Sequence, residues 1–83
     1  MADCLFTSRG QTRAQLMVSA LKAAGIVAST RKLPLKLANE GCAYGVAVAE
    51  NDRERALRTL RLEGLPPRRV YCERGYDWTE VGR

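Results

Sequence analysis

Apolar and polar residues follow two periods along the chain, and the switches between these periods mark the predicted elements. Short apolar or β-branched runs are typical of strands, whereas apolar residues that recur every three or four positions are typical of helices. In chain order, the pattern predicts a strand at 3–7, a helix at 11–24, strands at 26–32 and 43–50, a helix from 52 to about 63, and a strand at 68–73.

The two predicted helices end in the same way. Gly25 and Ile26 follow the first helix, and Gly64 and Leu65 follow the second in the same order. A glycine in this place adopts the left-handed conformation that closes a helix, and the apolar residue after it packs back onto the last turn. At the other ends of the helices, the expected N-cap residues are Ser8 and Asn51.

The order of the elements predicts an α+β fold of the ferredoxin-like, split βαβ type (β-α-β-β-α-β). In this fold two helices cover one face of a four-stranded antiparallel sheet. Right-handed crossovers give the strand order 4-1-3-2. We expect a single ferredoxin-like domain at residues 1–74 and a C-terminal tail at 75–83, because the tail has no clear periodicity.

The composition fits one small globular domain. The chain has 83 residues, of which 46% are hydrophobic, a share too high for a disordered chain. So small a domain leaves little room for both a core and a deep substrate cleft, so we expect a carrier or binding protein more than an enzyme. Because polar residues follow the short apolar start by Thr7, we expect no signal peptide, and the sequence contains no apolar run as long as a membrane span.

The charge pattern disfavours nucleic acid as a partner. The net charge of +5 is spread along the chain, which is typical of solvated faces. Domains of this fold commonly bind RNA through aromatic residues on the open face of the sheet. Phe6 and Tyr71 are the candidates, but the surrounding pattern of that motif is absent. The arginines of the second helix fit a solvated surface; they are Arg53, Arg55, Arg58 and Arg61.

Three cysteines stand far apart, without the paired spacing of a zinc or CxxC redox motif. Histidine is absent from the sequence, so we expect no metal and no cofactor. The pattern is typical of free thiols in a reducing cytoplasm. The predicted topology places Cys4 and Cys72 at the edge of the sheet opposite Cys42, where they can be cross-strand neighbours, and we interpret both as small buried residues.

The segment at 33–48, LPLKLANEGCAYGVAV, joins the two similar halves of the chain and has Cys42 at its centre. In the predicted topology Cys42 lies near the turn formed by Ser8, Arg9 and Gly10, where the first helix begins. Helix N-termini and arginines stabilise a thiolate and can also hold an anion such as an oxyanion of sulfur or selenium. We therefore expect this turn to stabilise a Cys42 thiolate, while a purely structural role for Cys42 stays open.

Other residues of this segment are expected to surround the site. Small side chains at Gly45, Ala47 and Ala49 predict close packing on the face of the sheet away from the helices. The expected neighbours of Cys42 in the loop and strand are Pro34, Lys36, Gly41, Tyr44 and Gly45.

The chain resembles a family of small bacterial domains described as selenium/sulfur (Se/S) carrier protein-like. The resemblance extends from Asp3 to about Glu73 and rests on the strand-helix start, the Ala24-Gly25-Ile26 helix ending and two motifs of the central segment. These motifs are Pro34-Leu35-Lys36 and Gly41-Cys42-Ala43-Tyr44-Gly45. Members often have arginine directly after the proline and glycine directly after the cysteine, where this chain has Leu35 and Ala43.

The resemblance implies a carrier in which Cys42 accepts sulfur or selenium as a persulfide or selenosulfide. The partners would then be sulfur- or selenium-donor and acceptor enzymes. The alternative is a non-catalytic adaptor or small-ligand regulatory domain that acts through a sheet edge or as a homodimer, in which Cys42 is structural.

Overall fold

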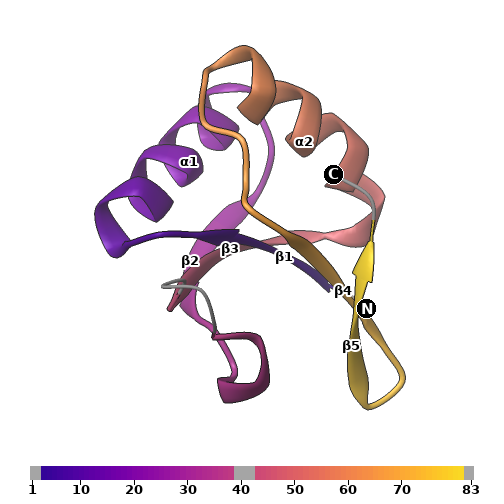
Figure 1. The fold of residues 1–83 in the computed structure, drawn as a ribbon. Helices are drawn as coiled ribbons and strands as arrows, with labels where there is room; N and C mark the ends of the chain where they lie inside the picture. The colour runs from indigo at the N-terminus through magenta and orange to yellow at the C-terminus, as the bar shows by residue number, and fades with distance from the viewer. Residues whose placement is uncertain (1–2, 39–42, 82–83) are drawn as a thin grey trace.

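A computed structural model describes residues 3–38 and 43–81 of the chain. Two helices cover one face of a five-stranded sheet, and a loop and a β-hairpin extend to the other side (Figure 1). The elements are β1 (Asp3–Ser8), α1 (Gln11–Ala23), β2 (Ala28–Lys32), the short 3-10 helix η1 (Leu35–Leu37), β3 (Tyr44–Ala49), η2 (Glu50–Asp52), α2 (Arg53–Leu62), β4 (Val70–Arg74) and β5 (Asp77–Val81).

The strand order is β2-β3-β1-β4-β5, and each adjacent pair is antiparallel. The first four strands have the predicted order 4-1-3-2, but the predicted count of four strands is wrong. Residues 77–81, which we assigned to a tail, pair with β4 as a fifth strand. Arg74 lies opposite Asp77, so the hairpin has a two-residue turn, and its first residue, Gly75, has a φ of 63°. Glycine adopts this angle without steric cost, which allows the chain to reverse and extend the sheet.

The main core lies between the helices and the sheet. Every second side chain of the central strands points into it. Phe6 of β1, Val46 of β3 and Val70 of β4 are fully buried there. Burial of a large apolar side chain contributes roughly 1.5–3 kcal/mol, so this layer is the main source of stability. The buried residues of α1 recur at helical spacing and are Ala14, Met17, Val18 and Leu21.

Both helices end as predicted. After α1, Gly25 has a φ of 79° and the Ile26 N–H donates to the Leu21 carbonyl at 2.9 Å. After α2, Gly64 has a φ of 72° and the Leu65 N–H donates to the Leu60 carbonyl at 2.8 Å. This bond pattern is the Schellman motif, in which a glycine with positive φ lets the chain turn back and satisfy a carbonyl of the last helical turn.

The predicted N-caps are wrong. Ser8 is the last residue of β1, and its hydroxyl donates to the Gly10 carbonyl at 2.8 Å instead of accepting a hydrogen bond from a helix N–H. Gly10 is the N-cap of α1 and has no side chain with which to cap it. At the second helix, η2 continues as far as Asp52, which replaces Asn51 as the N-cap residue. β1 runs one residue further than the predicted strand, and the 3-10 helix η2, which the apolar pattern does not indicate, precedes α2.

A smaller apolar cluster covers the opposite face of the sheet. Leu33 comes from the segment between β2 and β3, and it lies directly over Gly45 of β3. A Cβ atom at Gly45 would come within 2.8 Å of Leu33 Cδ2. The predicted close packing on this face is therefore confirmed. The cluster consists of Leu5, Leu33, Leu37, Ala47 and Tyr71, with Trp78 packed against it.

Candidate functional site

The turn at 8–10 and the start of β3, two parts of the predicted site, lie at the end of the sheet where β1 ends and α1 begins. Ser8 lies directly opposite Tyr44 in the β1–β3 ladder, and Thr7 lies opposite Gly45. The Leu33 N–H donates to the Ala43 carbonyl at 2.9 Å, which extends the pairing of β2 and β3 by one step. The start of α1 and the start of β3 therefore meet at the same end of the sheet. Gly41 and Cys42 lie outside the described residues.

The turn at 8–10 joins this end of β1 to α1. Ser8 is 2% exposed, and its hydroxyl is bonded to the Gly10 carbonyl. Arg9 is exposed and makes no ion pair with any residue in the described ranges. Among the residues that the structure describes, no capping side chain accepts a hydrogen bond from the first backbone N–H groups of α1. The helix N-terminus and Arg9 together make this end of the molecule electropositive.

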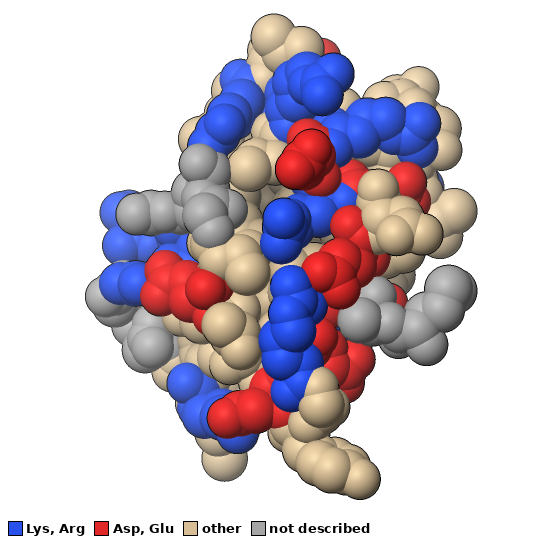
Figure 2. Space-filling view, turned by 90° about the vertical axis from the view of Figure 1, so that its right-hand side faces the viewer, with Lys and Arg blue, Asp and Glu red and all other residues tan. Residues whose placement is uncertain are grey.

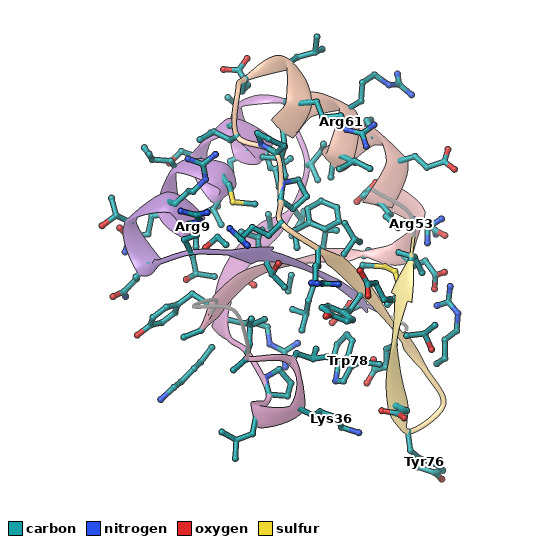
Figure 3. All side chains as sticks on the ribbon, viewed as in Figure 1. Arg9, Lys36, Arg53, Arg61, Tyr76 and Trp78 are labelled. Atoms are coloured by element: carbon teal, nitrogen blue, oxygen red, sulfur yellow. A yellow bond between two sulfur atoms is a disulfide. The ribbon has the colours of Figure 1, made fainter. Side chains whose placement is uncertain are left out.

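The loop residues of the predicted site have different contacts. Tyr44 is half-buried and packs against the main core, whereas Gly45 lies under Leu33. Pro34 precedes η1 as its N-cap residue. The side chain of Lys36 points toward the β4–β5 hairpin (Figure 3).

Lys36 and Asp77 tie the central segment to β5. Lys36 Nζ lies 2.6 Å from Asp77 Oδ1, and both side chains are largely exposed. The hydrogen bond from Lys36 lowers the pKa of the Asp77 carboxyl below its usual value of 3.8, and the Trp78 backbone N–H lowers it further. Lys36, which we grouped with the Cys42 loop, thus has an acidic partner within the chain.

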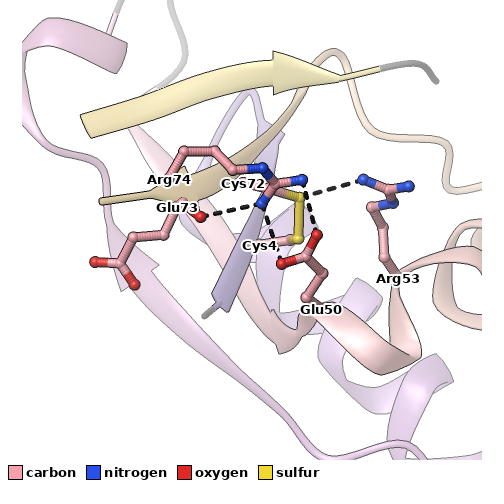
Figure 4. Close-up of a disulfide and its surroundings, with 6 residues drawn as sticks. All are labelled: Cys4, Glu50, Arg53, Cys72, Glu73 and Arg74. Atoms are coloured by element: carbon pink, nitrogen blue, oxygen red, sulfur yellow. Dashed lines mark hydrogen bonds and ion pairs between the residues drawn. A yellow bond between two sulfur atoms is a disulfide. The ribbon is translucent and has the colours of Figure 1, made fainter. Parts of the chain in front are cut away.

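A disulfide joins β1 to β4. Cys4 and Cys72 lie opposite each other in the ladder, as expected for cross-strand neighbours, and their sulfur atoms are 2.03 Å apart (Figure 4). Neither residue has exposed surface. The prediction of free thiols is therefore wrong for these two cysteines, because the β1–β4 register brings their side chains into bonding contact.

Polar side chains of α2 and β4 surround this disulfide. Arg53 donates from Nη1 to Cys72 Sγ at 3.6 Å. Arg74 Nη2 lies 2.8 Å from Glu50 Oε2 on the same side (Figure 4). Arg53 therefore contacts the buried disulfide from the first turn of α2.

The disulfide and the turn at 8–10 lie at different ends of β1. Cys4 and Ser8 are separated by about 13 Å along the strand, at a rise of about 3.3 Å per residue. The Cys4–Cys72 pair is therefore not part of the end at which β3 begins.

A family model described as "Putative Se/S carrier protein-like" matches residues 3–72. The match includes both helices and all of β1, β2 and β3. The chain belongs to this family. The resemblance noted from the sequence is thereby confirmed. No curated protein and no solved structure matches the chain significantly.

The surface of this Se/S carrier-like chain interleaves opposite charges on the side of α2 and β5. Figure 2 shows Lys and Arg side chains alternating with Asp and Glu across this side. Arg55 lies 3.4 Å from Asp52, and Arg69 lies 3.0 Å from Glu80. Such a surface fits the solvated face that we expected for Arg55, Arg58 and Arg61, which are exposed, whereas Arg53 is half-buried against Cys72.

The two aromatic candidates for base stacking lie on opposite faces of the sheet. Phe6 is paired with Val70 and Leu5 with Tyr71, so the side chains of Phe6 and Tyr71 point in opposite directions. Phe6 is fully buried under the helices, and Tyr71 is 8% exposed within the smaller cluster. This pair therefore forms no stacking platform.

Within residues 3–38 and 43–81, no three His, Cys, Asp or Glu side chains are grouped so that they could hold a metal ion. In the same ranges, neither helix has the length and apolar character needed to cross a membrane.

Sequence reasoning missed Arg53 as a neighbour of Cys72. Arg53 is the first residue of α2, and α2 packs over the strand pair that contains the disulfide. Helical spacing in a sequence predicts which side chains are buried and which are exposed. Arg53 is half-buried, so this spacing does not predict its contact with Cys72. The sequence contained no direct signal for this contact.

Proposed function

We propose that the chain carries sulfur or selenium on Cys42, as a persulfide or selenosulfide, between a donor enzyme and an acceptor enzyme. The observation that carries this proposal is the buried Cys4–Cys72 disulfide. It occupies two of the three cysteines of the chain, so Cys42 is the cysteine left for thiol chemistry. The description of the family supports the same chemistry.

The transfer step needs only the thiolate and a donor persulfide. The Cys42 thiolate attacks the outer sulfur of the donor, forms a new sulfur–sulfur bond and releases the donor cysteine as a thiolate. One sulfur–sulfur bond forms and one breaks, so no external oxidant or reductant takes part. An acceptor enzyme removes the outer sulfur by the same exchange in reverse.

The electropositive end of the sheet supports a reactive Cys42. Ser8 lies opposite Tyr44, which is two positions beyond Cys42 in the sequence. The start of α1 and the Arg9 guanidinium, which has no ion-pair partner within residues 3–38 and 43–81, are both located next to Ser8. These groups would lower the pKa of a nearby thiol, since they stabilise its charged form.

Alkylation at mildly acidic pH tests this reactivity. The folded protein is treated briefly with iodoacetamide at about pH 6, where an ordinary thiol of pKa about 8.5 is almost wholly protonated, and the labelled peptides are mapped. We expect Cys42 to react faster in the folded protein than in the denatured protein, because the thiolate is the reactive form. Arg9→Gln should slow the reaction, and Arg58→Gln, an exposed arginine of α2, is the matched control. A Cys42 that reacts no faster when folded contradicts the proposal.

A second candidate function is an adaptor that binds an extended acidic segment along β2. β2 is an edge strand, and a hollow of about 360 Å³ lies between it and α1. Lys22 lines this hollow, and Arg31 and Lys32 are exposed on the strand. An edge strand can pair with an added strand, and the three basic residues would favour acidic side chains on it.

Oligo-glutamate peptides test the adaptor function. Lys22→Gln and Arg31→Gln should each weaken binding of such a peptide, whereas Cys42→Ser should leave it unchanged. Absence of peptide binding at low salt removes this candidate and leaves the carrier proposal untouched.

A further inference from the structure

Three arginines line one hollow beside the start of α1. The cavity has a volume of about 310 Å³ and is lined by Arg9, Arg13, Pro66 and Arg68. None of the described residues that line it is acidic. The hollow therefore gathers positive charge from residues far apart in the sequence.

Rigid parts of the fold bring these arginines together. Arg9 follows β1 directly, and Arg13 lies in the first turn of α1. Arg68 is held beside the end of β1 by the backbone: its N–H donates to the Thr7 carbonyl at 3.1 Å, and the Thr7 N–H donates to the Arg69 carbonyl at 2.9 Å. The three guanidinium groups are thus supported by a strand end, a helix and a paired segment.

Two of the three arginines, Arg9 and Arg13, have no acidic partner within residues 3–38 and 43–81. The side chains of Arg9 and Arg13 form no hydrogen bond or ion pair with residues 3–38 or 43–81. The uncapped N-terminus of α1 adds partial positive charge on the same side. Like charges in one hollow repel each other, so an anion bound between them would relieve this repulsion and stabilise the fold.

We propose that this cavity binds a small organic phosphate through its phosphate group. Guanidinium groups match the geometry of phosphate oxygens and bind them with two parallel hydrogen bonds. The volume lies at the lower end of the range for ligand pockets, about 300–1,000 Å³, which suits a phosphate with a small organic group. Pro66 supplies an apolar wall for that group. The proposal shares Arg9 and the start of α1 with the proposed carrier site, but phosphate binding makes no use of the Cys42 thiol.

Calorimetric titration at low salt tests the site. The Cys42→Ser variant is titrated with AMP, with inorganic phosphate and with adenosine, so that the outcome does not depend on the thiol. We expect AMP and phosphate to bind one per chain and adenosine not to bind. Arg9→Gln and Arg13→Gln should each weaken AMP binding about tenfold, the loss expected for a charge-assisted hydrogen bond. Higher salt should weaken binding further.

The matched control is Arg58→Gln, which removes the same charge from an exposed position of α2. It should change the affinity for AMP by less than about twofold, because Arg58 does not line the cavity and so makes no hydrogen bond to the bound phosphate. Circular dichroism of each variant verifies that the fold is retained. Equal losses in Arg13→Gln and Arg58→Gln, or no binding of AMP at low salt, would overturn the proposal. Single-stranded RNA that binds the same arginines far more tightly than AMP would also overturn it.

Discussion

Cys4 and Cys72 face each other across β1 and β4, with their sulfur atoms bonded and no surface exposed on either residue. The bond joins positions 68 apart in the sequence and so closes most of the chain into one loop. A cross-link of this span restricts the unfolded chain strongly. In a domain this small, whose core is limited, such a restraint is a large part of the total stability.

Removal of this disulfide should destabilise the protein. The Cys4→Ala/Cys72→Ala double variant is expected to lower the free energy of unfolding by about 2–4 kcal/mol, measured by urea denaturation. The comparison is made in a Cys42→Ser background, so that no other thiol reacts. Dithiothreitol should destabilise the parent protein and leave the double variant unchanged. Identical transition midpoints for parent and double variant would show that the bond adds no stability.

The close contact between Leu33 and Gly45 predicts that a methyl group added at position 45 destabilises the fold. In Gly45→Ala the new Cβ would lie 2.8 Å from Leu33 Cδ2 and 3.0 Å from the Phe6 carbonyl oxygen. Such overpacking should lower the free energy of unfolding by about 1–3 kcal/mol, again measured by urea denaturation.

Leu33→Ala supplies the matched test of this contact. Because Leu33→Ala removes the close atom, Gly45→Ala should destabilise the Leu33→Ala protein less than it destabilises the parent. Additive losses in the double variant would mean that the side chain of Leu33 does not restrict position 45.

The Lys36–Asp77 ion pair predicts a pH dependence. Because the pKa of Asp77 is lower in the folded protein than its usual 3.8, the pair stabilises the fold above about pH 3.8. This stabilisation is lost as the pH falls through the lowered pKa of the folded state. Carboxyl NMR titration should give Asp77 a midpoint below 3.8, and Lys36→Met should raise it toward that value.

The control for this titration is Lys32→Met, which removes an exposed lysine from β2. It should leave the Asp77 midpoint in place. Added salt should raise the midpoint in the parent protein, because both side chains are exposed and their attraction is screened. An Asp77 midpoint that does not respond to Lys36→Met would contradict the ion pair.

Local chemistry made the order of the first four strands predictable. Gly25 and Gly64 mark the helix ends because only a residue without a Cβ adopts their positive φ freely. Once both helices were placed between strands, the handedness of the crossovers determined the strand order. The fold of the first four strands therefore followed from a few local signals.

The fifth strand was missed because its burial does not alternate. Residues 77–81 are exposed or half-buried on both faces, so no apolar period marks them. The signal that could have found the strand is the Gly75-Tyr76 pair, since a glycine at the first position of a two-residue turn is typical of a hairpin. An edge strand exposed on both faces has little need of an apolar pattern.

The disulfide and the N-caps were not predicted correctly from the sequence. The disulfide depends on the register of β1 and β4, and the N-caps depend on where the preceding elements end. Topology placed Cys4 and Cys72 on neighbouring strands, but only the β1–β4 register puts them directly opposite each other. A shift of one residue would have turned their side chains to opposite faces. Ser8 failed as a cap because β1 continues through it, and its hydroxyl is bonded to Gly10. Apolar patterns do not encode either relationship.

Transfer of sulfur from a small persulfide shows whether Cys42 is the residue that carries sulfur. The folded protein is incubated with glutathione persulfide and digested without reduction, and the peptides are mapped by mass spectrometry. The account predicts one added sulfur on the Cys42 peptide, none on the disulfide-linked Cys4 and Cys72 peptides, and none in Cys42→Ser. The bound sulfur should then pass to an added acceptor thiol. Sulfur found equally on Cys42 in folded and denatured protein, or not found on Cys42 at all, would contradict the account.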